Sequence, residues 1–132
     1  MNRLEAIVTE VRQNEGVSLV RFDASGVSLA MVGLEPPVNI APKRRVTLGI
    51  KATHIALAAS TPEQTTLQNA LPVRIEAIDE GEILASIQCR FHDTPLEAIV
   101  PMSAIESLKL APGDRAWTLF LESEVFVLEI FS

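Results

Sequence analysis

The stretch that decides the fold is Arg45-Val-Thr-Leu-Gly-Ile-Lys-Ala-Thr-His-Ile-Ala-Leu57, because it occurs a second time as Arg115-Ala-Trp-Thr-Leu-Phe-Leu-Glu-Ser-Glu-Val-Phe-Val127. The two runs align without a gap, and a proline stands three residues before each, at Pro42 and Pro112. Two copies of one unit therefore make up nearly the whole chain.

The upstream sequence supports the same repeat. Leu4-Glu-Ala-Ile-Val-Thr-Glu-Val11 matches Leu71-Pro-Val-Arg-Ile-Glu-Ala-Ile78, and Arg21-Phe22 matches Arg90-Phe91. The polar, proline-containing run around Pro62 separates the copies. We predict a first repeat at residues 1–60, a linker at 61–68 and a second repeat at 69–132.

Hydrophobic residues alternate with polar ones along most of the chain, a period of two that predicts strands with one buried face. Between the third and fourth strands the copies differ. The second copy has apolar residues at helical spacing over Met102–Leu108, with Ser103 as a candidate N-cap, whereas the first has a proline-broken run at 34–40. The pattern predicts an all-β protein of two tandem five-stranded barrels resembling the oligonucleotide-binding fold, with one short helix in the second copy.

Composition narrows the classes of function. The 132 residues are 48% hydrophobic, and a formal net charge of −6 opposes nucleic-acid binding as the main task. A nucleic-acid-binding barrel would also need a basic face with aromatic residues, and the chain has no Tyr, five Phe and one Trp. A single cysteine excludes an internal disulfide, and the absence of long apolar runs predicts no direct membrane insertion. We expect a cytoplasmic protein.

Catalytic and metal-binding motifs are missing. His54 and His92 lie outside any pattern with metal-ligand spacing, and the sequence has neither a Gly-x-Ser-x-Gly elbow nor a phosphate-binding loop. Both histidines are expected to be ordinary surface or interface residues. We therefore predict neither catalytic residues nor a protein-bound metal ion.

Two polar clusters could hold an anion. Ile50-Lys-Ala-Thr-His-Ile55 places an ammonium and a hydroxyl at the bend between two strands, and Thr65-Thr-Leu-Gln-Asn69 places hydroxyl and amide groups just before the next strand. A tetrahedral dianion is bound by this kind of chemistry: a positive charge, hydroxyls and free backbone N–H groups. By itself, Lys51 is as well explained as an exposed charge that protects a strand edge.

Together, these clusters resemble motifs of the molybdenum-pterin-binding, or TOBE, family of tandem β-barrels. The family repeat opens with a Ser-Ala-Arg-Asn-x-Leu type motif, matched here by Thr66–Leu71, and closes with an Ile-Lys-Ala/Ser-Ser/Thr-x-Val type motif, matched by Ile50–Ile55. The arrangement is most similar to the C-terminal regulatory domain of the ATP-binding subunit of molybdate ABC transporters. The resemblance implies a regulatory module that takes molybdate or tungstate as its ligand, without a covalent cofactor.

The resemblance also implies a homodimer in which the opening motif of one unit and the lysine motif of another hold the oxyanion. Its partners would be the ATPase and membrane subunits of a transporter, which would place it at the inner membrane. The resemblance assigns oxyanion binding to Lys51, Ala52, Thr53, Thr66, Gln68 and Asn69. Gln68 stands where the family usually has arginine. In the second copy Leu121, Glu122 and Glu124 replace the lysine motif, and a nearby carboxylate would repel a dianion.

Those departures favour an alternative, a ligand-free module of the same fold that serves dimerisation only. In either case we expect the dimer contact near Phe120, Phe126 and Phe131 on the outer strands. The start at Met1, in the middle of an opening motif, is compatible with a natural start or with a boundary inside a longer protein.

Overall fold

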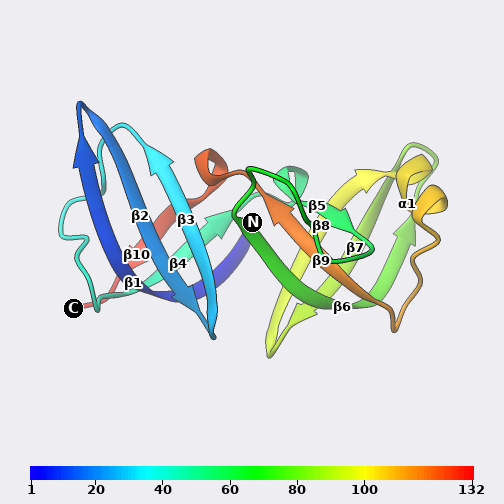
Figure 1. Cartoon of the computed structure of the whole chain (residues 1–132). Coiled ribbons are helices and arrows are strands. Elements are labelled where there is room, and N and C mark those ends of the chain that lie inside the picture. Colours follow the sequence, from blue (N-terminus) through cyan, green and yellow to red (C-terminus); the bar gives the residue numbers. More distant parts are fainter.

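The computed structural model describes all 132 residues and contains ten strands, one α-helix and two 3-10 turns, η1 and η2 (Figure 1). The elements of the first half are β1 (Asn2–Asn14), β2 (Val17–Ala24), β3 (Val27–Gly33), β4 (Arg45–Ile50), η1 (Ala52–His54) and β5 (Ala56–Ala58). Those of the second half are β6 (Asn69–Glu80), β7 (Leu84–Phe91), β8 (Thr94–Pro101), α1 (Met102–Leu108), β9 (Arg115–Phe120), η2 (Glu122–Glu124) and β10 (Phe126–Ile130). The predicted all-β fold with one short helix is confirmed.

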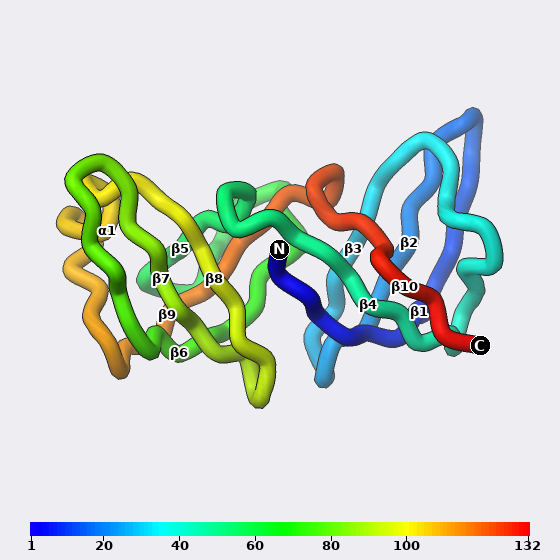
Figure 2. The backbone as a smooth tube through the Cα atoms, turned by 180° about the vertical axis from the view of Figure 1, so that it is seen from behind, coloured from blue at the N-terminus to red at the C-terminus, as the bar shows by residue number.

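The strands form two curved, five-stranded antiparallel sheets that exchange their last strands. One sheet has the order β10-β4-β1-β2-β3 and the other β5-β9-β6-β7-β8; we call them the first and second barrel. The C-terminal strand β10 therefore completes the first barrel, and β5 of the first repeat completes the second (Figures 1 and 2). A repeat in the sequence and a barrel in the structure are thus different sets of residues.

Strand pairing repeats closely between the barrels. Asn2 pairs with Ile50 as Asn69 pairs with Phe120, and the β1–β2 and β6–β7 pairs carry a bulge at the equivalent place. The pairing of these strands is therefore the same in both repeats.

The predicted match of Arg21-Phe22 with Arg90-Phe91 is wrong by two residues. Phe22 lies opposite Val8, and Cys89 lies opposite Ile75, so Phe22 and Cys89 are the equivalent positions. A shift of two residues keeps every side chain on the same face of a strand, which is why the alternation did not reveal it.

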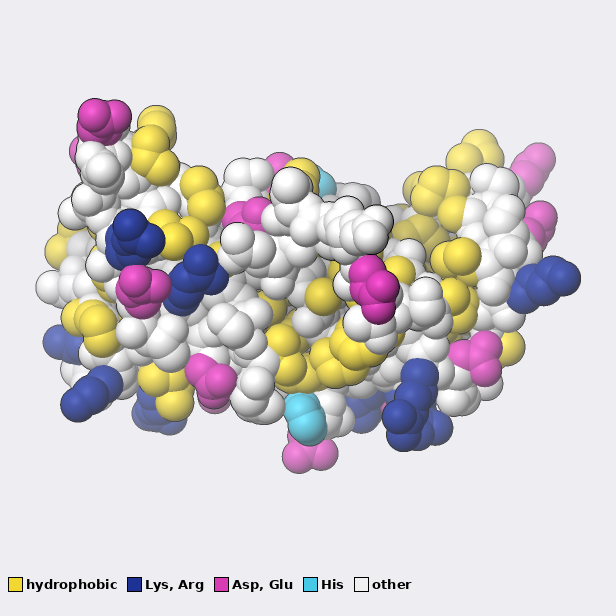
Figure 3. Space-filling view, in the orientation of Figure 1, with side chains coloured by type: hydrophobic (Ala, Val, Ile, Leu, Met, Phe, Trp, Pro, Cys, Tyr) yellow, Lys and Arg dark blue, Asp and Glu magenta, His cyan; other side chains and the backbone are white.

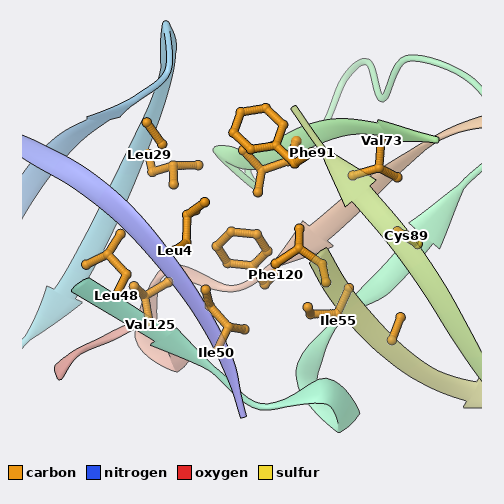
Figure 4. Packing of buried hydrophobic residues seen from close by; sticks show 14 of the residues in the cluster. Leu4, Leu29, Leu48, Ile50, Ile55, Val73, Cys89, Phe91, Phe120 and Val125 are labelled. Atoms are coloured by element: carbon orange, nitrogen blue, oxygen red, sulfur yellow. The ribbon is translucent and has the colours of Figure 1, made fainter. Parts of the chain in front are cut away.

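The core is one cluster of 26 buried residues that runs through both barrels. Ile55 and Val125, the residues after the two 3-10 turns, point into the junction together with Phe91 and Phe120 (Figure 4). Phe120 is only 2% exposed, so its predicted place at a dimer contact is wrong: it lies on the inward face of β9. Phe126 and Phe131 are half-buried.

The helix α1 spans Met102–Leu108 as predicted and buries Ile105 against the second barrel. Its N-cap is Pro101, without a side-chain hydrogen bond, so the predicted cap at Ser103 is wrong. The corresponding segment of the first repeat has no helix, and residues 59–68 form an irregular connection. The single α-helix, at seven residues, is too short to span a bilayer.

Candidate functional site

Both 3-10 turns lie at the centre of the molecule, where the chain crosses from one barrel to the other (Figure 1). The turn η1 packs against β8 of the second barrel, and η2 packs against β3 of the first. The turns also contact each other, because His54 Nδ1 lies 2.9 Å from Glu124 Oε2. The junction therefore has two related halves, one built around each turn.

A buried asparagine joins the barrels in each half. Asn69, at the start of β6, is fully buried; its Oδ1 accepts from the Ala30 N–H at 2.7 Å and its Nδ2 donates to the Ala30 carbonyl at 2.9 Å. Asn2, the equivalent residue of β1, makes the same pair of bonds to the Glu97 backbone, at 2.7 and 2.8 Å. Each asparagine amide thus pairs with the backbone N–H and C=O of an edge strand in the opposite barrel, as a neighbouring strand would, and so ties the two barrels together.

The half built around η1, which we call the Lys51 half, has hydrogen-bond donors without partners in the chain. Lys51 is exposed, with extended backbone before η1, and its ammonium forms no ion pair. Thr53 is also exposed, and its hydroxyl makes no hydrogen bond within the chain, while Ala52 is buried. Asn2 flanks this half through its pairing with Ile50. The half can therefore offer a cation and a hydroxyl to an anion.

In the half built around η2, which we call the Glu122 half, the opening motif is hydrogen-bonded to a carboxylate. The Gln68 backbone N–H donates to Glu122 Oε1 at 3.2 Å, and Gln68 Oε1 accepts from the Arg21 guanidinium at 2.9 Å. Thr66 is exposed with a free hydroxyl. Within one chain, Gln68 and Asn69 are thus brought together with the Glu122 turn, and no hydrogen bond connects Thr66, Gln68 or Asn69 to the Lys51 turn.

The sequence interpretation gave no role to Arg21. Arg21 also pairs with Glu10, at 3.3 Å, and it supplies a positive charge beside Gln68, where the family resemblance implies an arginine. Nothing local in the sequence signals this contact, because 47 positions separate Arg21 from Gln68. Asn2 likewise has a part at the junction that no local pattern in the sequence signals, since its partner Glu97 lies 95 positions away.

Comparison with known proteins confirms the family resemblance. The TOBE domain model matches residues 65–127, so the second repeat carries a TOBE domain. Among curated proteins, Molybdenum import ATP-binding protein ModC 1 of Azotobacter vinelandii is 28% identical over 116 residues, which is 86% of this chain and 30% of that protein. ModC of Brucella abortus is 29% identical over 119 residues, 88% of this chain and 31% of that protein. The chain thus spans less than a third of these relatives.

Among solved structures, the cytoplasmic molybdate-binding protein ModG, crystallised with molybdate bound, superposes with a TM-score of 0.88. The superposition covers 96% of this chain and 94% of that one, at 22% sequence identity. It establishes that the two proteins share their fold.

Proposed function

We propose that this chain, which carries a TOBE domain, binds molybdate or tungstate and regulates a molybdate transporter from the cytoplasmic side. One observation carries the proposal: Lys51 and Thr53 offer an unpaired ammonium and a free hydroxyl at a turn between two barrels. The relatives support the choice of ligand, since ModC proteins are named for molybdenum import and ModG for molybdate binding. Coupling to an ATPase and to membrane subunits rests on the ModC relatives alone.

The binding site we propose combines two copies of the chain. Lys51 supplies charge, Thr53 a hydroxyl, and the small Ala52 allows the anion to approach the backbone. The opening motif of a second copy would complete the shell, because within one chain that motif is bonded to Arg21, Glu122 and Ala30 instead. The groups that remain free and exposed there are the Thr66 hydroxyl and the Gln68 Nε2, whereas the Asn69 side chain is fully buried and positions the motif. This arrangement requires a homodimer.

A second function, dimerisation without a ligand, is favoured by the Glu122 contact. A carboxylate already accepts the N–H of Gln68, so one half of the junction satisfies its donors without an added anion. The Lys51 half has no such internal carboxylate on its ammonium, since Glu124 pairs with His54. We therefore assign oxyanion binding to the Lys51 half and a structural role to the Glu122 half.

Calorimetry with molybdate and tungstate tests the proposal. The wild-type chain should bind at most one oxyanion per chain, and Lys51→Ala should lose about a hundredfold in affinity, on the order of 3 kcal/mol, because the anion loses the ammonium at the turn. Leu121→Ala, at the equivalent position of the other turn, is the matched control and should leave binding unchanged. Light scattering should give a dimer mass. A wild-type dissociation constant above about 1 mM would leave dimerisation as the function.

A further inference from the structure

Three arginines stand side by side on the outer face of the second barrel. Arg74 of β6 pairs directly with Arg90 of β7 on one side and with Arg115 of β9 on the other. All three side chains are exposed. Like charges placed directly opposite each other destabilise a sheet, so this arginine row has a cost unless an anion compensates it.

The chain compensates only one end of the arginine row. Arg90 forms an ion pair with Glu76 at 3.0 Å and donates to the Asp93 carbonyl at 3.1 Å. Arg74 has only the Gly113 carbonyl, at 3.3 Å, and Arg115 has no hydrogen-bond or ion-pair partner. Two adjacent guanidinium groups therefore lack a carboxylate, in a chain whose net charge is −6.

The fold does not require the arginine row. In the first barrel the equivalent positions are Asp23, Ile7 and Arg45, which pair in the same register and carry one charge of each sign. The shallow groove there also includes Glu5, so its net charge is negative. The positive row belongs to the second repeat alone.

The arginine row lines a groove of about 560 Å³. Trp117 and Pro72, which pair with each other across β9 and β6, line the same groove, and so does His92. In Figure 3 basic side chains gather along the lower edge of the second barrel, beside the β7–β8 turn. Trp117 is two residues along β9 from Arg115, on the same face and roughly 7 Å away. The volume falls within the range of small-molecule sites.

We infer that this groove binds a small organic phosphate that carries a planar ring, the class to which nucleoside phosphates belong. Guanidinium groups bind phosphate oxygens in a planar, two-pronged geometry, which Arg74 and Arg115 can provide together. The half-buried Trp117 offers an aromatic surface on which a ring can stack. The site is separate from the Lys51 turn, so the inference does not depend on the proposed oxyanion function.

Trp117 is the only tryptophan, so its fluorescence reports directly on the groove. Titration with ATP should change the emission saturably, and the apparent affinity should fall as salt is raised. Arg74→Ser and Arg115→Ser should each weaken binding by roughly tenfold or more, as expected for a lost charge-assisted hydrogen bond. Arg45→Ser, which removes the equivalent arginine of the first barrel, is the matched control and should bind normally.

Comparing ATP with ribose 5-phosphate and with inorganic phosphate distinguishes phosphate binding by the arginines from stacking of the base on Trp117. Both should bind at least tenfold more weakly than ATP because neither has a planar aromatic base to stack on Trp117. Calorimetry on Trp117→Leu, with circular dichroism to check the fold, should show the same loss for ATP. The inference is overturned if ATP gives no saturable change at millimolar concentration. It is equally overturned if the arginine substitutions have no effect, or if ribose 5-phosphate binds as well as ATP.

Discussion

Replacing Asn69 by alanine tests whether the buried asparagine holds the two barrels together. The side chain is fully buried and bonds both backbone groups of Ala30, at 2.7 and 2.9 Å. Alanine removes both partners at once. The N–H and C=O of Ala30 then stay buried without a hydrogen bond, since β3 is the edge strand of its sheet and has no other strand on that side.

The expected cost follows from those two backbone groups. Each unpaired buried polar group costs about 1–3 kcal/mol, and water that enters the vacated space recovers part of it. We expect Asn69→Ala to lower the free energy of unfolding by about 3 kcal/mol and the melting temperature by roughly 10 °C. Asn2→Ala should cost less, about 1–2 kcal/mol, because its bonds to Glu97 lie nearer to solvent.

Urea unfolding followed by Trp117 fluorescence and by circular dichroism measures both effects. Asn14→Ala is the control, since Asn14 is exposed and its side chain makes no hydrogen bond. The two signals should change together, because the exchanged strands and the shared core make the barrels one cooperative unit. A loss below about 0.5 kcal/mol for Asn69→Ala, the usual size of a surface substitution, would refute the reasoning.

Three further outcomes are expected. Gly49→Ala should destabilise the fold by about 1–3 kcal/mol in urea unfolding, because its Cβ would stand 2.8 Å from the Phe126 ring, whereas Gly33→Ala, in open space, should not. Burial, and secondarily Glu76, raises the pKa of the Cys89 thiol from 9.0 to about 11, so stability should fall between these pH values by on the order of 2 kcal/mol as only the unfolded thiol ionises. The fall should be absent in Cys89→Ala. Leu121→Lys combined with Glu122→Ala should raise molybdate stoichiometry to two per chain in calorimetry.

The repeat, the strand alternation and the helix were predictable because each depends on neighbouring residues. A period of two in the sequence gives the buried face of a strand, and the apolar spacing at Met102, Ile105 and Leu108 gives a helix. Strand exchange was not predictable in this way. The short strand β5 would show the same sequence pattern whether it paired with a strand of the first barrel or with β9 of the second. Its partner depends on the path that η1 takes across the junction.

The same exchange explains why only part of the candidate site could be foreseen. The chemistry of Lys51 and Thr53 is visible in the sequence, but which opening motif faces them depends on the crossing of the chain. Because β9 pairs with β6, Asn69 meets the turn that follows β9, and because β4 pairs with β1, Lys51 lies beside Asn2. Each half of the junction therefore joins the opening and closing motifs of the same barrel, and within one chain no hydrogen bond connects Gln68 to the Lys51 turn. The oligomeric state is thus part of the binding hypothesis, and a strictly monomeric chain that still bound molybdate through Lys51 would contradict the two-copy site.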